Sequence, residues 1–198
     1  MTRRTGITTQ AIFRTAKQYA NLENFIAQGS RRAVQRSVKA AQDTKARAAI
    51  AHYNLSGTPY RGVNAIKRRF RTALGARGSN GLTQAIERLV APAGIPLRLY
   101  GARKVKGGVR FSIVRGKPHT LRSAFSHAGF AGGHIFRRDR GTDGRLVGRL
   151  PISKRFGPGL PYLIQNREIA FQGRQTFQRR LKDELQKEET RAWKRAGL

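Results

Sequence analysis

Residues 148–164, GRLPISKRFGPGLPYLI, constrain the fold of this chain more than any other stretch. They hold three prolines within eleven residues, two glycines flank the second proline, and apolar residues separate these positions. Proline fixes φ and removes a backbone donor, so neither a helix interior nor a central strand tolerates prolines at this density. A surface turn would not need so many apolar residues. The stretch therefore predicts a rigid apolar corner between two elements.

The chain around this corner is strongly basic. It has 198 residues, with 41 Lys and Arg against 10 Asp and Glu, which gives a formal net charge of +31. A free monomer with this charge repels itself, so we expect an acidic partner: nucleic acid, an acidic protein neighbour, or both. The absence of cysteine excludes disulfides and thiolate metal sites. No apolar run approaches the roughly 20 residues that span a bilayer, so we expect no membrane partner.

Helical periodicity dominates both ends of the chain. Residues 8–27 predict a helix that Gly29 ends, and Ser30 is then expected to cap a longer, alanine-rich helix over 30–53. A short amphipathic helix is predicted over 61–74. The C-terminal residues 166–193 predict a last helix, with an apolar stripe formed by Phe177, Leu181, Leu185 and Trp193.

The middle of the chain predicts strands. Residues 95–103 and 107–117 alternate between apolar and basic side chains, and 131–139 form a shorter candidate strand. Residues 82–91 fit either a helix or a strand. Residues 140–145 predict a turn. The aromatic residues of this region suit strand cores more than a platform for stacking bases; they are Phe111, Phe125, Phe130 and Phe136.

This order of elements predicts an α+β fold, with N-terminal helices and a C-terminal helix packed on a small antiparallel β-sheet. We expect a single domain over residues 1–198. Its predicted parts are an N-terminal helical extension (1–29), helices (30–79), an antiparallel sheet (80–150), and the proline-rich corner with the C-terminal helix (151–198).

The sequence offers no convincing catalytic constellation. His127 and His134 lie seven residues apart around a glycine-rich segment, and Asp139 and Asp143 sit beside arginines in the predicted turn. None of these spacings is that of a metal-ligand set. We therefore expect no enzymatic activity, no metal and no cofactor, although a basic nuclease stays open as a third possibility.

Basic runs recur through the body of the chain, with few acids to compensate them. Between Glu87 and Asp139 there is no acid at all. We expect these runs to contact a polyanion or an acidic neighbour. The candidate contact residues are Lys67, Arg68, Arg69, Arg71, Arg103, Lys104, Lys106, Arg137 and Arg138.

The colinear set of segments resembles the minor tail protein Z family of long-tailed bacteriophages, the tail completion proteins. The similarity begins in the alanine-rich residues 32–51, continues through 63–73, 94–103, 106–117, 123–129 and 133–139, and is sharpest at the corner. There, members of the family have an arginine-flanked Pro-Ile, a short apolar link and a second proline turn before the C-terminal helix. The loop over 141–148 is longer than usual for the family.

The resemblance implies a structural virion protein at the head-proximal end of the tail, which completes the tail for head–tail joining and DNA passage. It implies a strand over 82–91. The implied partners are further copies of the chain in a ring, most simply a hexamer, together with tail terminator, tail tube or head–tail connector proteins and the genomic DNA in the channel. The implied location is the tail neck, and the host cytoplasm during assembly.

The corner is then a fixed connector between the sheet and the last helix. We expect Ile152, Phe156, Leu160 and Leu163 to enter the core or a neighbouring subunit. The candidate residues for the structural corner or subunit contacts are Pro151, Ile152, Phe156, Pro158, Leu160 and Pro161. The alternative function is a non-catalytic basic nucleic-acid-binding protein of ribosomal or nucleoid type, which the charge alone would suggest.

Overall fold

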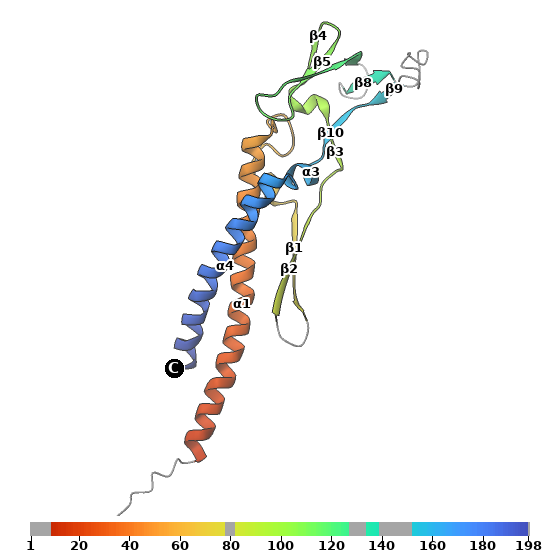
Figure 1. Cartoon of the computed structure of the whole chain (residues 1–198). Coiled ribbons are helices and arrows are strands. Elements are labelled where there is room, and N and C mark those ends of the chain that lie inside the picture. The colour runs from red at the N-terminus through yellow and green to blue at the C-terminus, as the bar shows by residue number, and fades with distance from the viewer. Residues whose placement is uncertain (1–8, 78–81, 127–133, 139–151, 198) are drawn as a thin grey trace, which may run out of the picture. The chain divides into compact units, whose positions relative to one another are not determined.

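The computed structural model describes residues 9–77, 82–126, 134–138 and 152–197, and its fold is α+β, as predicted. A long N-terminal helix and a C-terminal helix are combined with small antiparallel sheets (Figure 1). The helices are α1 (Thr9–His52), α2 (Val63–Lys67), η1 (Leu97–Tyr100, a 3₁₀ turn), α3 (Leu160–Ile164) and α4 (Arg167–Ala196).

The strands form four small sheets. Their order within each sheet is β1–β2, β10–β3, β4–β5–β6 and β7–β8–β9. The bounds are β1 (Phe70–Arg77), β2 (Leu82–Leu89), β3 (Gly94–Pro96), β4 (Arg103–Val105), β5 (Gly108–Phe111), β6 (His119–Arg122), β7 (Ala124–Ser126), β8 (Ile135–Arg138), β9 (Ile152–Lys154) and β10 (Phe156–Pro158).

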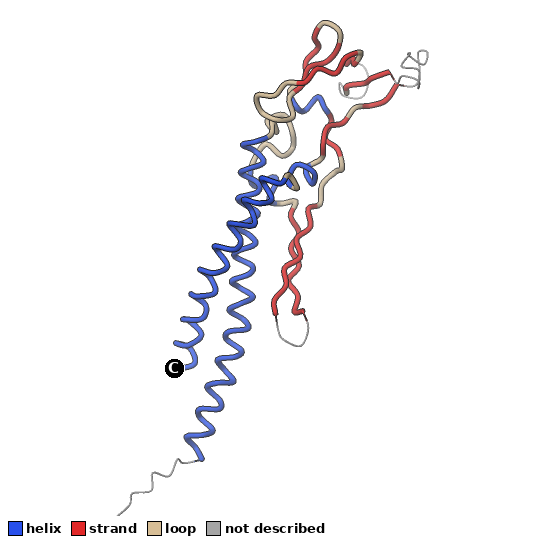
Figure 2. The backbone as a smooth tube through the Cα atoms, viewed as in Figure 1, coloured by secondary structure: helices blue, strands red, loops and turns tan. Residues whose placement is uncertain are grey.

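The chain divides into two compact units, which we describe one at a time. Unit 1 comprises Met1–Ala41, Thr72–Glu87 and Arg174–Leu198, and unit 2 comprises Gln42–Arg71 and Arg88–Gly173. Unit 1 thus holds most of α1, of α4 and of the β1–β2 hairpin (Figure 2). Unit 2 holds the other sheets and the corner.

Unit 1 is built on an antiparallel pair of helices with small residues between them. Ala33 and Ser37 are completely buried on α1, and Ala192 is 2% exposed on α4. The buried Ser37 hydroxyl donates to the Ala33 carbonyl at 2.8 Å, so its polar group is satisfied within its own helix. A modest apolar cluster of Leu22, Ala192 and Ala196 adds to the pair. The other buried apolar side chains of α1 in this unit are small or of medium size: Val34, Val38 and Ala41. Polar contacts therefore add to the pairing of the helices.

The prediction of two helices before residue 53 is wrong, because α1 runs without a break from Thr9 to His52. Gly29 is buried within it, and a Cβ added there would lie 2.9 Å from the Glu188 Cβ. Ser30 does not cap a helix; its hydroxyl donates to the Ala27 carbonyl at 2.8 Å inside the helix. Gly29 therefore serves the close approach of α4 rather than a helix end.

The core of unit 2 is larger and contains several bulky side chains. The Tyr100 and Leu160 side chains are completely buried, and Leu163 is 1% exposed. The helix predicted over 61–74 is wrong beyond Lys67, since α2 ends there and β1 begins at Phe70. The Val90 amide donates to the Arg69 carbonyl at 2.9 Å, so pairing with β2 competes successfully with local helix propensity.

The strand predictions are partly right. Residues 82–89 form a strand, as the family resemblance implies, and 135–138 form another. The strand predicted over 95–103 is wrong at its centre, where Leu97–Tyr100 form a 3₁₀ turn that Gly101 ends with φ of 68°. The strand over 107–117 stops at Phe111, because the chain then leaves the sheet and Val114 bridges to Tyr53. The turn predicted over 140–145 lies outside the described residues.

The C-terminal helix is present, but its predicted apolar stripe is wrong at Leu185 and Trp193. Leu185 is 39% and Trp193 is 40% exposed. The residues that α4 buries here instead are spaced four apart: Glu188, Ala192 and Ala196. Small residues on this series let α1 approach closely, and larger side chains would hold the helices apart. Phe177 and Leu181 of the predicted stripe are half-buried, and Leu185 and Trp193 are exposed.

Candidate functional site

The first group of predicted basic contacts, residues 67–71, is partly used within the fold of unit 2. The Lys67 ammonium lies 3.0 Å from a carboxylate oxygen of Asp43, whose other oxygen accepts from Arg47 at 2.6 Å. The hydrogen bonds from Arg47 and Lys67 lower the pKa of Asp43. Lys67 is therefore an ion-pair partner of α1 and not a free cation.

The arginines that follow Lys67 are exposed. The Arg69 guanidinium lies 5.9 Å from the centre of the Tyr60 ring, which is a cation–π distance. Arg68 ends α2, and Arg71 lies on β1. Their side chains are available to an anion, but no described element aligns them in a row.

The second group of predicted basic contacts, residues 103–106, lies on sheet β4–β5–β6. The strand register decides which face of the sheet each side chain occupies. Arg103 on β4 lies directly opposite Arg110 on β5, and Lys104 lies opposite Val109. Successive side chains point to opposite faces, so Arg103 and Lys104 diverge. Lys106 is exposed in the turn between the two strands. Arg103 is the member of this group that shares a face with further arginines.

Two arginines of this face, Arg110 and Arg122, were not among the sequence candidates. Arg122 on β6 lies opposite Gly108, two residues along β5 from Arg110. The signal was present in the sequence, since Val109 and Phe111 alternate with Arg110. Arg122 needed the pairing of β5 with β6, which the sequence did not predict.

The third group, on β8, belongs to another sheet. Arg137 is half-buried and lies opposite Ala124 on one side and Ser153 on the other. The side chain of Arg138 lies outside what the structure describes. The structure thus distributes the predicted cations over several elements of unit 2.

The proline-rich corner is a fixed element of unit 2. Phe156, Gly157 and Pro158 pair with Pro96, Ile95 and Gly94 as strand β10 on β3. The buried Tyr100 hydroxyl donates to the Pro158 carbonyl at 2.7 Å, and burial raises the pKa of this phenol. A Cβ added at Gly157 would lie 2.6 Å from the Tyr100 ring, so the glycine permits this contact. Pro161 then occupies the first turn of α3, a position that favours proline.

The apolar residues of the corner divide between interior and surface. Leu160 and Leu163 lie in the core, as expected. Ile152 is 38% and Phe156 is 53% exposed, so of the two expected places, the core and a neighbouring subunit, the core is wrong for these residues and the neighbouring subunit stays a prediction. Both side chains sit on edge-forming strands of small sheets, where one face is open. Pro151 lies outside the described residues.

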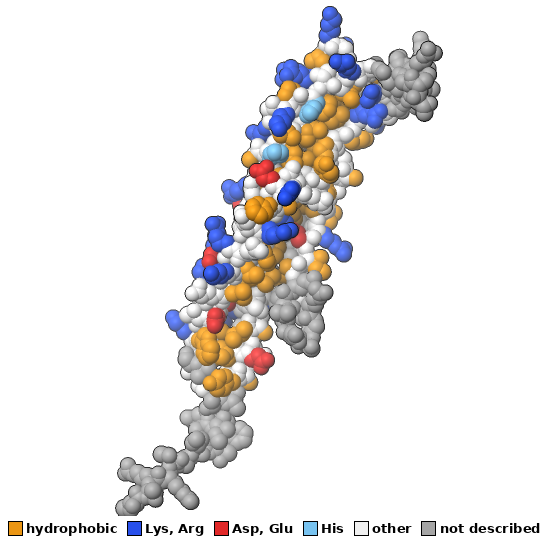
Figure 3. Space-filling model, in the orientation of Figure 1, with side chains coloured by type: hydrophobic (Ala, Val, Ile, Leu, Met, Phe, Trp, Pro, Cys, Tyr) orange, Lys and Arg blue, Asp and Glu red, His pale blue; other side chains and the backbone are white. Residues whose placement is uncertain are grey.

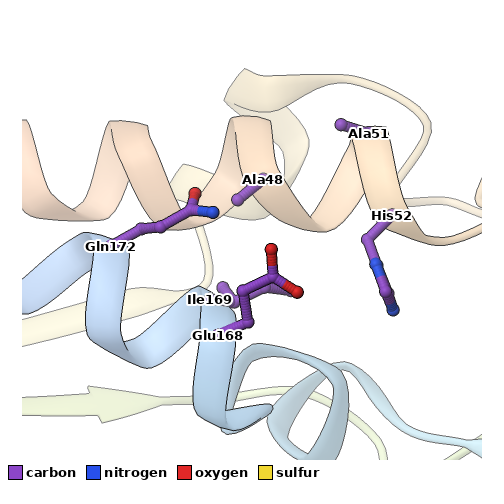
Figure 4. A pocket seen from close by; sticks show the side chains of 6 residues that line it. All are labelled: Ala48, Ala51, His52, Glu168, Ile169 and Gln172. Carbon is purple, nitrogen blue, oxygen red and sulfur yellow. The ribbon is translucent and has the colours of Figure 1, made fainter.

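A shallow pocket of about 250 Å³ lies between the end of α1 and the start of α4 within unit 2 (Figure 4). Its lining residues are Ala48, Ala51, His52, Glu168, Ile169 and Gln172. Glu168 stands in the first turn of α4, where the helix dipole favours an acid. One imidazole and one carboxylate on an open surface do not make a reactive constellation.

Within the described ranges, no three His, Asp or Glu side chains come close enough to hold a metal ion. His134 packs near the rings of Phe136 and Phe156, with centroids 6.5 and 6.3 Å away. His127, Asp139 and Asp143 lie outside these ranges. Among the helices of the described part, none combines the length and the apolar character that crossing a bilayer requires.

The aromatic residues weighed for base stacking are core-associated where they can be placed. Phe136 is buried, and Phe111 packs against the core of unit 2 from the inner side of its sheet. Phe125 stacks on Phe136 with centroids 6.1 Å apart. Phe130 is not among the described residues.

Comparison of the chain with protein-family models, with curated proteins and with solved structures finds no match. The resemblance to the minor tail protein Z family therefore rests on the sequence segments alone.

Proposed function

We propose that this chain is a structural virion protein that completes the head-proximal end of a phage tail for head–tail joining and DNA passage. The observation that carries the proposal is the exposed apolar surface at the proline-rich corner, where the family resemblance is also sharpest. Phe156 is 53% and Tyr162 is 72% exposed there, in a chain with a net charge of +31. Large apolar groups held at a rigid surface suit burial against another subunit.

The corner is well suited to this role because its backbone is fixed before any partner arrives. The pairing of β10 with β3 and the bond from Tyr100 to Pro158 hold the turn on which Phe156 lies. Tyr162 follows on α3, between the buried Leu160 and Leu163. A preformed anchor loses little conformational entropy on binding, so more of its burial appears as affinity.

The expected assembly is a ring of identical copies, most simply a hexamer, in contact with tail terminator, tail tube or connector proteins. Copies of charge +31 repel each other. Assembly therefore needs acidic neighbours or DNA in the channel to neutralise part of this charge. No catalytic role and no cofactor enter the proposal.

A paired substitution at the corner tests the proposal. In the double variant Phe156→Ser/Tyr162→Ser, we expect a folded protein that no longer enters tails, measured as its copy number in purified particles by mass spectrometry. Val90→Ser is the matched control, since Val90 is 56% exposed in the same unit. Normal incorporation of the double variant, or absence of the natural chain from particles, would refute the assembly role.

The charge distribution favours a second candidate, a non-catalytic nucleic-acid-binding protein of ribosomal or nucleoid type. Residues 88–138 contain eleven Lys and Arg and no Asp or Glu. The two candidate functions predict different binding partners in the cell. A tail completion protein should be found with tail and head proteins, and a nucleic-acid-binding protein with RNA or bulk DNA. Affinity purification of the tagged chain from infected and uninfected cells separates them.

A further inference from the structure

We propose that the outer face of sheet β4–β5–β6 is a binding surface for the phosphate backbone of double-stranded DNA, centred on Arg103, Arg110 and Arg122. This inference does not depend on the virion assignment, because it follows from the register and charge of one sheet of unit 2. It names a surface that differs from the sequence candidates in two of its three residues.

The strand register places the three arginines together. Arg103 lies directly opposite Arg110, and such pairs have Cβ atoms about 4.5–5.5 Å apart. Arg122 pairs with Gly108 and is thus diagonal to Arg110, at about 7–8 Å. Thr120 lies opposite Arg110 on the same face. Three guanidinium groups therefore share one side of a three-stranded sheet.

The opposite side of the sheet fixes this arrangement. Val109 is 1% exposed in the core of unit 2, and Phe111 and Leu121 pack against the same core. These residues alternate with Arg110 and Arg122, so the arginines must face away from the core. All three arginine side chains are exposed. The sheet thus presents its cations to solvent on a backbone that does not need to rearrange.

No ion pair among the described residues accounts for this concentration of charge. Like charges directly opposite each other destabilise a sheet. Among the described residues, Arg103, Arg110 and Arg122 have no carboxylate partner within ion-pair distance. The visible side of the molecule in Figure 3 likewise shows many more basic than acidic side chains. An external anion would relieve the repulsion within the sheet.

The chemistry of the face selects duplex phosphate over bases. Arginine forms paired hydrogen bonds with phosphate oxygens. The aromatic residue of β5, Phe111, lies on the inner side, so this face offers no ring on which a base could stack. A short strand of guanidinium groups and a threonine does not read base edges in a groove. We therefore expect binding that is insensitive to sequence and strongly dependent on salt.

The test measures the affinity of the full-length chain for a 25-base-pair duplex across a series of salt concentrations. The slope of log K against log salt is about −0.9 for each phosphate neutralised. In the triple variant Arg103→Gln/Arg110→Gln/Arg122→Gln, we expect the slope to flatten by about three units. The single variant Arg110→Gln should flatten it by about one, which keeps the test valid even if the triple variant folds poorly.

Two matched variants serve as controls. Arg103→Lys/Arg110→Lys/Arg122→Lys keeps the charge and should keep the slope. Arg174→Gln/Arg179→Gln/Arg180→Gln removes the same charge from exposed positions of α4 in unit 1, and should change the slope by less than one unit.

Equal flattening in this control would overturn the proposal, because net charge alone would then explain binding. An unchanged slope in the sheet variants would also overturn it, and combined with lost particle incorporation would assign the face to an acidic protein. If the corner variant no longer enters tails but its DNA slope is normal, that loss concerns the assembly role and does not bear on the DNA-binding face.

Discussion

The two units of the chain use charge in opposite ways. Unit 1 contains six of the ten acids, with 17 Lys and Arg, whereas unit 2 has four acids and 24 Lys and Arg. In unit 1 the buried Glu188 carboxylate joins the helices by accepting from Arg32 at 2.8 Å and from Arg36 at 2.9 Å, and it also accepts from Arg191 of its own helix at 2.7 Å. In unit 2 the arginines of sheet β4–β5–β6 stand outside an apolar core.

The contrast follows from what each unit can bury. The helix pair of unit 1 meets through Ala33, Ser37 and Ala192, which supply little apolar area. Its acids therefore contribute to internal cohesion. Unit 2 has large buried side chains such as Tyr100 and Leu160, so its fold relies less on ion pairs such as Lys67 with Asp43, and its exposed arginines remain for a partner.

The largest expected effect comes from removing a core side chain of unit 2. Leu160→Ala should lower the free energy of unfolding by about 2–5 kcal/mol, because it leaves a cavity beside completely buried neighbours. Leu22→Ala in unit 1 should cost about 2 kcal/mol, at the lower end of this range, since its apolar cluster is small. Urea denaturation with hydrogen exchange reports on both. If both variants lose the same free energy of unfolding, the two cores do not differ in the way proposed.

A charge-specific change should affect unit 1 next. Glu188→Gln should destabilise the helix pair by about 2–3 kcal/mol, because it removes the anion that accepts hydrogen bonds from three arginines. Glu189→Gln is the control, with an exposed side chain and an expected change within about 0.5 kcal/mol. Thermal unfolding of both variants checks the prediction. If Glu188→Gln proves as mild as its control, then the small-residue contacts alone hold the helices.

Acidification should also destabilise unit 1, because it protonates Glu188 and Glu184. The loss of unfolding free energy should be smaller than that expected for Glu188→Gln. Burial raises the pKa of Glu188, but the hydrogen bonds and charges of Arg32 and Arg191 outweigh it, so the pKa lies below its ordinary value of 4.5. The hydrogen bond from Arg36 lowers the pKa of Glu184. Carboxylates with depressed pKa values stabilise the fold above about pH 4.5, and this stability is lost as the pH falls through the folded-state values.

Hydrogen exchange in α1 and α4 between pH 6 and pH 3 measures this loss. Glu188→Gln should show a shallower pH dependence than the natural chain. The same dependence in both would mean that other acids, such as Asp43 with its lowered pKa, are responsible.

The smallest effect is expected at the surface of the corner. Ile152→Asp should change the free energy of unfolding by no more than about 0.5 kcal/mol, because the side chain is 38% exposed and its register partner is Arg138. Leu163→Asp, at 1% exposure, should cost several kcal/mol by burying a carboxylate without a partner. The melting temperatures of the Ile152→Asp and Leu163→Asp variants check this prediction. A severe loss from Ile152→Asp would place this residue in the core after all.

Sequence reasoning succeeded where the signal was local. The α4 helix, the β8 strand and the corner were predicted from periodicity and proline placement alone, and the α+β class followed from their order. It failed where a distant partner decides the outcome. Gly29 ends a helix by local propensity, but Glu188 packs over it, and Phe70 continues a helical pattern until β2 pairs with its strand.

The candidate surface shows the same division. Arg103 could be named from a basic run, and the outward direction of Arg110 was implied by the alternation around it. Arg122 could not, because only the pairing of β5 with β6 brings it to that face. The predicted stripe on α4 was wrong at Leu185 and Trp193 for a related reason. Side chains at helical spacing indicate a buried face only where another element packs on that face, and α4 buries Glu188, Ala192 and Ala196 instead.

The contact between Gly29 and Glu188 also constrains how this chain can diverge. A side chain at position 29 would meet the Cβ of residue 188 at 2.9 Å, so position 29 cannot gain a side chain without pushing the helices apart unless residue 188 is glycine. Relatives that acquire alanine or a larger residue at 29 should carry glycine at 188, and would then lose the acid that binds Arg32 and Arg36. Substitutions at 32 and 36 should follow. Three neighbouring positions of α1 and one distant position of α4 are thus expected to vary together.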